Sequence, residues 1–521
     1  MYPWRMQTAT QNRVRVLPKA WPAACWALPL ATLALQLVTY RGYGFFRDEL
    51  YYLASAEHLG LGYVEHPPVI GFVAWLVRST LGDSLFAARL LPAAAHAAVV
   101  ALAALLAREM GGGRYAQFAA ALATALAPAY VGLCGILSMN AFDLLAWAAL
   151  WLVAARILRT EDPRLWLPFG AIAGLGLQNK ISVLFLGFGI VAGLIVTRRW
   201  RMLRSPPLWA GGAIAALIFL PHVVWQWQNG WPTLEFIANA TREKNVAFAP
   251  GAFLAEQVAQ MGVLAAPLWV AGLAGLLAAG RLRAFRPVGW AYLAVLAVML
   301  ATNSKPYYLV PAYTSLFAAG AVLAEGVRRP LARTLVGGAV VLGIVAGGVA
   351  LLPFAKPLLS TDAFLRYSAA LGVGPRTEER HELGRLPQQY ADMHGWQELA
   401  ADLATVYHSL PAADRERACI YVQNYGEAGA VDVLGAPLGL PRAISGHNSY
   451  YLWGPRGCTG DVMIVLGGNP ADHRELFASV EQVGVHTCTD CMPHENNRPI
   501  WVLRGARVPF AQIWPRVKRF I

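Results

Sequence analysis

Charged residues are scarce in this chain. Asp, Glu, Lys and Arg make up 14% of its 521 residues, whereas hydrophobic residues make up 57% and the mean hydropathy is +0.43. This composition excludes an ordinary soluble globular protein and predicts a membrane protein. Apolar runs of about 17 to 25 residues recur from about Trp21 to Pro353, and each is long enough to cross a hydrocarbon core of about 30 Å.

No removable signal peptide is expected at the N-terminus. The first nineteen residues contain four basic residues and no acid, and no small-residue cleavage site follows a short apolar core. We therefore expect the first apolar segment to remain as an anchor, preceded by a cytoplasmic tail at residues 1–20.

The net charge of +13 does not predict nucleic-acid binding, because much of the excess lies in short loops at 198–204, 281–286 and 328–333. Loops rich in Lys and Arg stay in the cytoplasm. A self-consistent topology then has about eleven spans, near residues 21–40, 84–107, 114–132, 138–158, 165–179, 181–197, 208–227, 252–280, 287–302, 306–325 and 334–353. With a cytoplasmic N-terminus, this order places the C-terminal part outside the membrane.

Residues 21–353 are thus predicted to form a transmembrane catalytic domain with a large outer loop at 41–83, and residues 354–521 a periplasmic soluble domain. The alternation of predicted helices and strands in the soluble part favours a small α/β layer. Its segments are a helix at 396–410, strands at CIYVQN, DVMIVLGG and RPIWVLRG, and a helix at DHRELFASV. The turn expected at YGEAGAV lacks G-x-G-x-x-G spacing, so nucleotide binding is not predicted there.

Only six cysteines are present, and four of them, Cys419, Cys458, Cys488 and Cys491, fall in the predicted exported domain. Four cysteines allow three pairings, which the sequence leaves open. The CTDC at Cys488 lacks a second C-x-x-C, so structural disulfides are favoured over a redox or zinc pair.

The few acidic and basic residues gather at one predicted face. Asp48, Glu49, Glu65 and His66 lie in the outer loop, Lys180 lies at a turn between two short spans, and Lys305 precedes a late span. Asn140 and Asp143 share a helix face near the same end. Each of these residues also has a structural explanation that involves no substrate. Asp48 and Glu49 can cap a helix, Glu65 can be a solvated acid, and His66 can form a structural hydrogen bond. The lysines can be snorkelling interface anchors, and Asn140 and Asp143 can form hydrogen bonds between helices.

Their chemistry fits transfer from a lipid-linked phosphate. A carboxylate can deprotonate an acceptor hydroxyl, and Asp48 with Glu65 can hold a divalent metal ion. Lysines at headgroup depth can hold a lipid phosphate. Because a sugar phosphate already has a good leaving group, one carboxylate suffices as the base, which predicts inversion at the anomeric carbon.

Four segments together resemble the bacterial branch of the protein O-mannosyltransferase clan, within the GT-C glycosyltransferases, which also includes the lipid A aminoarabinose transferase. The segments are RDELYYLASAEHLGLGYVEHPPVIGF, SMNAFDLLAW, NKISVLF and SKPYYLVPAY. The resemblance implies a membrane enzyme that transfers a sugar from a polyprenyl monophosphate carrier, with inversion, on the outer side of the membrane.

The resemblance also implies roles for the acids of the outer loop. Asp48 corresponds to the proposed base, with Glu49 beside it. Glu65 corresponds to an acid before a proline that helps to hold a divalent ion or the acceptor.

Further positions correspond to donor-binding residues of the family. Lys305, Tyr307 and Tyr308 correspond to the polar start of a late span that faces the donor phosphate, and Lys180 to a basic residue at a turn. His66 stands where the aminoarabinose enzyme has lysine, and we include it with Asn140 and Asp143 among the residues predicted to bind the donor phosphate or the substrate.

The sequence therefore predicts an inverting glycosyltransferase of the bacterial inner membrane. It would move a sugar from an undecaprenyl-phosphate carrier to a periplasmic glycan, lipid or protein. A transporter or flippase for a lipid-linked sugar is the alternative from another class, and a binding or scaffolding protein is a third. A transporter should place its charged sites near the bilayer midplane and show repeat symmetry, and neither feature is evident in the sequence.

Overall fold

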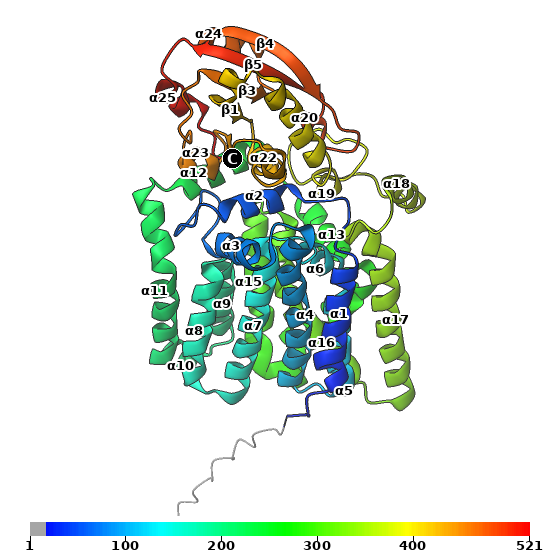
Figure 1. Cartoon of the computed structure of the whole chain (residues 1–521). Coiled ribbons are helices and arrows are strands. Elements are labelled where there is room, and N and C mark those ends of the chain that lie inside the picture. The colour runs from blue at the N-terminus through cyan, green and yellow to red at the C-terminus, as the bar shows by residue number, and fades with distance from the viewer. Residues whose placement is uncertain (1–16) are drawn as a thin grey trace, which may run out of the picture.

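The computed structural model describes residues 17–521, so most of the predicted N-terminal tail lies outside the described residues. A bundle of helices forms one part of the molecule, and a small sheet with its own helices covers one end of it (Figure 1). We call this covered end the outer end. Two short helices, α2 (Arg47–Ser55) and α3 (Val69–Leu81), lie across the bundle between these parts.

Six helical segments among the described residues are long and apolar enough to cross a membrane. They are α4 (Leu85–Glu109), α7 (Met139–Thr160), α11 (Pro206–Gln228), Gly280–Ala301 with α15 (Arg286–Ala301), Pro306–Glu325 with α16 (Tyr313–Glu325), and α17 (Pro330–Ala355). A multi-pass helical membrane protein is thereby confirmed. The total of eleven spans stays a prediction.

The predicted span at 252–280 contains a sharp bend, so a single crossing there stays a prediction. This segment is divided into α13 (Pro250–Met261) and a second part, Val263–Ala278, and the two are bent by 94°. The second part contains α14 (Ala266–Ala278). The break lies at Gly262, whose φ of +90° suits glycine far better than any other residue. The first part contains Glu256, Gln257 and Gln260, whereas the second part is apolar throughout.

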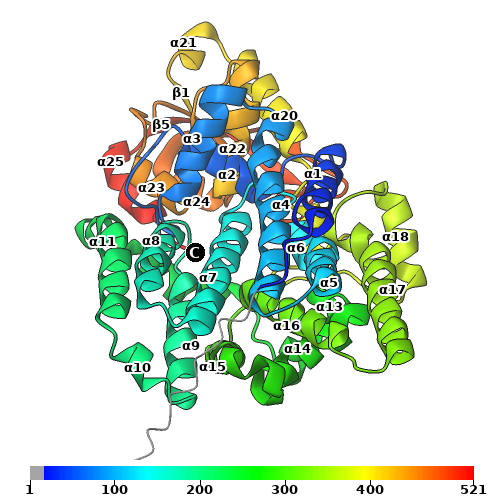
Figure 2. The same cartoon turned by 90° about the horizontal axis from the view of Figure 1, so that it is seen from below.

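Shorter helices complete the bundle. They are α1 (Leu28–Val38), α5 (Arg114–Leu126), α6 (Pro128–Leu133), α8 (Trp166–Leu177), α9 (Val183–Val196) and α10 (Trp200–Leu203). The turn expected near Lys180 is confirmed between α8 and α9. Figure 2 shows the bundle from the end opposite the sheet, with α11 and α17 on opposite sides. Helices α8 and α11 touch through Gly170 and Gly211, where a Cβ on Gly170 would lie 2.0 Å from the Gly211 carbonyl oxygen.

The C-terminal sheet has the strand order β2-β1-β3-β5-β4. Its strands are β1 (Ala418–Tyr421), β2 (Ala443–Ile444), β3 (Val462–Leu466), β4 (Phe477–His486) and β5 (Arg498–Ala506). β1 pairs in parallel with β2 and β3, whereas β5 is antiparallel to β3 and β4. Ile420 faces Ile464, which faces Val502, and all three are buried.

Helices surround the sheet and connect it to the bundle. They are α12 (Pro232–Asn239), α18 (Thr361–Ala370), α19 (Gln388–Ala391), α20 (Trp396–Ser409), α21 (Ala412–Arg415), α22 (Tyr425–Leu434), α23 (Ser449–Trp453), α24 (Pro470–Leu476) and α25 (Phe510–Ile513). The helix predicted at 396–410 and the three predicted strands are confirmed. One hydrophobic core joins Leu50 of α2 with Ile420 and Ile464 of the sheet, so the outer loop and the soluble part pack as a unit.

Two predictions in this part are wrong. DHRELFASV is helical only to Leu476, after which β4 begins. The sequence did not indicate this strand, because β4 is exposed along most of its length and lacks a clear apolar alternation. YGEAGAV is the helix α22 rather than a turn. The Asn424 side chain caps its first turn and Glu427 completes a capping box, which outweighs the glycines.

The cysteines pair as Cys419–Cys458 and Cys488–Cys491. The first pair links β1 to the loop before β3, and the second closes the CTDC segment. Disulfides are therefore present where the sequence favoured them.

Candidate active site

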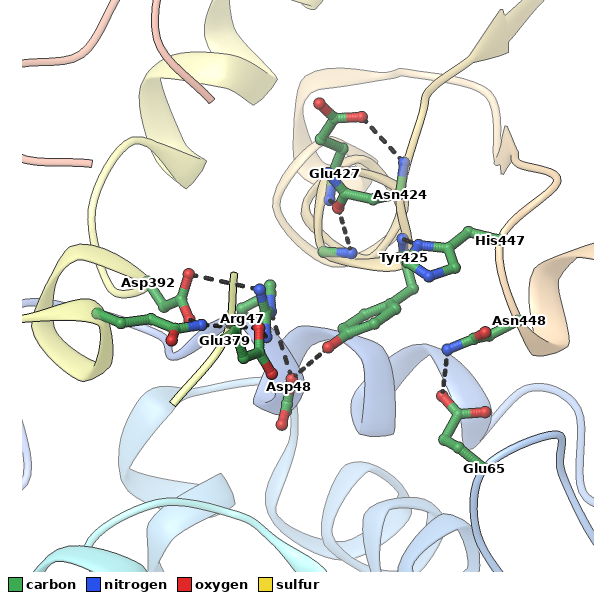
Figure 3. Close-up of polar contacts among 12 residues, drawn as sticks. Arg47, Asp48, Glu65, Glu379, Asp392, Asn424, Tyr425, Glu427, His447 and Asn448 are labelled. Atoms are coloured by element: carbon green, nitrogen blue, oxygen red, sulfur yellow. Dashed lines mark hydrogen bonds and ion pairs between the residues drawn. The ribbon is translucent and has the colours of Figure 1, made fainter. Parts of the chain in front are cut away.

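Helix α22 of the soluble part packs directly on α2 of the outer loop. A Cβ on Gly426 would lie 2.5 Å from Cγ of Arg47, and a Cβ on Gly429 would lie 2.8 Å from the backbone carbon of Leu50. This close approach brings Tyr425 and Asn448, which follow β1 and β2, to the acids of the outer loop (Figure 3).

Asp48 keeps a partly accessible carboxylate. Its side chain is 31% exposed, and its Oδ1 accepts a hydrogen bond of 2.9 Å from the Tyr425 hydroxyl. Arg47 lies 3.5 Å away. Asp48 can therefore reach a substrate while its neighbours hold its orientation, as a general base requires.

Glu49 has a different environment, and its position argues against the catalytic role predicted for it. It is fully buried, and Arg89 donates to both of its oxygens at 2.9 and 2.7 Å. The backbone N–H groups of Phe46 and Leu137 also donate to it, each at 2.8 Å. A carboxylate so saturated holds the outer loop against the bundle, in agreement with the capping alternative.

Glu65 lies beside Tyr51, which follows Asp48 by three residues in α2. Its oxygens accept hydrogen bonds from the hydroxyl of Tyr51 at 3.1 Å and from the side-chain amide of Asn448 at 3.2 Å. Burial raises the pKa of Glu65 to about 7, and the nearby charge of Asp48 adds to the rise. A carboxyl group with such a pKa exchanges its proton near neutral pH.

The phosphate contact predicted for His66 is not supported. The ring is buried, stacks on Tyr63 with centroids 4.5 Å apart, and its Nδ1 lies 2.9 Å from the Pro67 carbonyl oxygen. Burial lowers the pKa of His66 to about 4, so the ring is neutral at pH 7 and provides no cation.

Lys180 meets the predicted residues of α7. Its Nζ donates to Oδ1 of Asn140 at 2.7 Å and lies 3.7 Å from Oδ2 of Asp143. The same Nζ lies 4.8 Å from the ring centroid of Tyr308 and 5.4 Å from that of Tyr307. Five predicted residues thus form one group, which we call the Lys180 cluster.

Lys305 enters a second group. Its Nζ donates to Oε1 of Glu379 at 2.9 Å, and Glu379 also lies 3.6 Å from Lys244 and 3.8 Å from Arg47. Arg47 in turn lies 3.6 Å from Asp392. We call these five residues the Lys305 cluster, and it adjoins Asp48 through Arg47.

Sequence analysis missed Glu379, Lys244, Arg47 and Asp392 as members of the site, as well as Tyr425 and Asn448. Glu379 stands in a polar stretch, RTEERHE, which is typical of a solvated loop, and Lys244 in a similar stretch, TREK. Of these residues, only Arg47 could have been predicted as part of the site, because it is adjacent to Asp48 in the sequence.

The metal ion predicted at Asp48 and Glu65 stays a prediction. Both Glu65 oxygens already accept hydrogen bonds from neutral groups, and one Asp48 oxygen accepts from Tyr425. Among the described residues, no three His, Cys, Asp or Glu side chains lie together as metal ligands. Two carboxylates alone make an incomplete ligand set for a divalent metal ion.

Comparison with solved structures identifies the fold. ArnT from Cupriavidus metallidurans, bound to undecaprenyl phosphate, superposes with a TM-score of 0.60 at 14% identity, covering 92% of this chain and 98% of that one. Its apo form gives 0.57 at 16% identity, covering 91% and 96%. Arabinofuranosyltransferase AftD from Mycobacteria gives 0.50 at 14% identity, covering 95% of this chain and 41% of that one. The fold is that of the GT-C glycosyltransferases.

Within this class, residues 65–225 match the family described as dolichyl-phosphate-mannose-protein mannosyltransferase. No curated protein sequence matches the chain. The resemblance to the protein O-mannosyltransferase clan is confirmed by the family match over residues 65–225, and the chain as a whole has the fold of the GT-C glycosyltransferases.

Proposed function

We propose that this protein is an inverting glycosyltransferase that moves a monosaccharide from a polyprenyl phosphate carrier to a hydroxyl group of a glycan, lipid or protein. The observation that carries the proposal is the position of Asp48. A partly exposed carboxylate lies beside the Lys305 cluster at the outer end of an apolar bundle, within a fold that ArnT shares.

The reaction follows from these groups. The acceptor oxygen forms a bond to the anomeric carbon while the bond from that carbon to the phosphate oxygen breaks. Asp48 takes the acceptor proton, and the carrier leaves as a phosphate monoester. Lysine side chains stabilise the charge on the departing phosphate. Because one carboxylate acts from the face opposite the leaving group, the configuration inverts.

The orientation in the membrane is part of the proposal. The Arg-rich loops next to α10 and before α17 lie at the end of the bundle opposite the sheet (Figure 1). Loops of this kind stay in the cytoplasm, so the site and the soluble part face the periplasm of a bacterial inner membrane.

The test uses purified protein in nanodiscs with a panel of polyprenyl-phosphate sugars and acceptor extracts of the cell envelope. We expect release of free carrier phosphate together with a product of inverted anomeric configuration, seen by NMR. A flippase would move the labelled donor across a liposome membrane and leave the sugar on its carrier. If no donor in the panel is consumed, the proposal fails.

A further inference from the structure

Three cations from separate parts of the chain meet at one carboxylate. Arg47 begins α2, Lys244 ends the short helical turn Ala240–Lys244, and Lys305 precedes the Pro306–Glu325 helix. All three lie within 3.8 Å of Glu379, whose side chain is 7% exposed. Figure 3 shows Glu379 beside Arg47 and next to Asp48.

Electrostatics keep this carboxylate ionised. Burial alone would raise the pKa of Glu379, but Lys244, Arg47 and Lys305 outweigh it and hold the pKa well below the usual range. Burial lowers the pKa of Lys244, and Glu379 offsets only part of that effect. The cations therefore require an anion at this position.

Glu379 is carried by an irregular strap, which we define as residues 376–381. The strap lies along residues 242–246 through a few backbone contacts: the N–H of Val246 donates to the Glu378 carbonyl at 3.1 Å, and the N–H of Arg380 to the Lys244 carbonyl at 2.7 Å. It belongs to no helix or sheet, and its end is held by an exposed ion pair between Arg376 and Glu256. Arg380 also donates to the carbonyl oxygens of Asn245 and Arg242, and Gln388 donates to Oε2 of Glu379 at 2.9 Å. Opening of the strap therefore has to exchange these bonds for bonds to the phosphate and to water.

A sugar-bearing phosphodiester carries one negative charge, the same as a carboxylate. Exchange of one for the other leaves the charge of the cluster unchanged, and both present oxygens to the same N–H donors. Binding of a phosphate in addition to Glu379 would bring two anions together in a buried place, which is costly.

We infer that Arg47, Lys244 and Lys305 form a phosphate-binding site that the protein's own Glu379 occupies in the free state, and that the phosphate of the carrier displaces Glu379 on binding. The inference rests on the proposed function for the identity of the phosphate. Return of Glu379 after transfer then competes with the spent carrier and assists its release.

The main experiment measures the binding of undecaprenyl phosphate to the full chain in nanodiscs, without turnover. Glu379→Gln keeps the shape of the side chain and removes the competing charge, so we expect at least about tenfold tighter binding and stronger product inhibition. Glu382→Gln removes one exposed charge from the neighbouring residues and should bind as the wild type does. Unchanged or weaker binding by Glu379→Gln would overturn the inference.

A second measurement needs no variant. Displacement of Glu379 predicts faster amide hydrogen exchange at residues 376–381 of the wild type when undecaprenyl phosphate is added. Increased protection would show that phosphate joins Glu379 instead, and would also overturn the inference. Inorganic phosphate at millimolar concentration forms a separate arm: the same acceleration there would assign the site to free phosphate as well as to lipid.

The two proposals fail separately. Tighter binding by Glu379→Gln with no sugar transferred from any donor would retain the phosphate site and reject the enzymatic proposal. Sugar transfer by the wild type with no gain of affinity in Glu379→Gln would do the reverse.

Discussion

The two lysine clusters at the outer end of the bundle are neutralised in different ways. Lys180 is held by a neutral amide at 2.7 Å, and the nearest carboxylate, that of Asp143, lies at 3.7 Å. Lys305 donates to an ionised carboxylate at 2.9 Å that arrives on a distant strap. The Lys180 cluster belongs entirely to the bundle, whereas the Lys305 cluster forms only when the segment after α17 folds back. One cluster is a fixed feature, and the other can change partners.

The largest expected effect concerns Asp48, which adjoins the Lys305 cluster, in comparison with Asp143 of the Lys180 cluster. Asp48→Asn removes the proposed base, and we expect kcat to fall by about 10²- to 10⁴-fold. Asp143→Asn removes the charge near Lys180 and keeps an amide oxygen that can still accept from Ser182, so we expect kcat to fall only about tenfold. The measurement is carrier-phosphate release by the two purified variants, with thermal unfolding as the control for folding. Equal losses would remove the distinction between the clusters.

The next effect concerns the lysines themselves. We expect Lys305→Met to raise the donor KM by about 10- to 100-fold, because a charged hydrogen-bond donor to phosphate is lost. Lys180→Met should have a smaller effect, since its charge is committed to Asn140 and Asp143. Titration of both variants with undecaprenyl phosphate gives the ranking. A larger loss for Lys180→Met would place the phosphate at the other cluster.

A smaller effect is expected from the soluble part. Tyr425→Phe removes the hydrogen bond to Asp48, and we expect kcat to fall by about 3- to 10-fold with the donor KM unchanged. Tyr450→Phe is the matched control, since its buried hydroxyl donates to Asp432 at 3.0 Å and touches neither candidate acid. If both variants lose kcat alike, the role of Tyr425 is only in folding.

The smallest effect is a dependence of stability on pH. Burial raises the pKa of Glu65 from 4.5 to about 7, so the folded chain binds a proton that the unfolded chain releases. Glu65 should therefore lower the stability progressively as the pH rises from about 4.5 to about 7, with no further loss above. Thermal unfolding of wild type and Glu65→Gln over this range gives the comparison. Parallel curves would show that folding does not shift the pKa of Glu65.

Much of the membrane part was predictable because its signals are local. Apolar runs marked the helices, the polar residues near Lys180 marked the turn, and the spacing of Asn140 and Asp143 placed them on one face. Asp48 and Glu49 could not be separated in this way. They are adjacent in sequence, but successive helical residues point about 100° apart, so one faces the site and the other faces Arg89.

The rest of the site depends on contacts between distant segments. Tyr425 meets Asp48 across 377 residues, and Asn448 meets Glu65 across 383. Glu379 meets Lys305 through a stretch with no regular structure. Sequence periodicity does not indicate contacts between segments so far apart in the chain. The charged stretches that contain Glu379 and Lys244 favoured solvent exposure instead.

The close contact of α22 with α2 limits which soluble domain of another enzyme could replace the one in this protein. At Gly426 and Gly429 a hydrogen atom stands where other residues carry a methyl group or more. In a grafted domain, alanine in place of Gly429 would clash with the backbone of α2, and the domain would have to shift away from α2. Such a shift would separate the hydroxyl of Tyr425 from the carboxylate of Asp48, even in a graft that keeps every other residue of this surface.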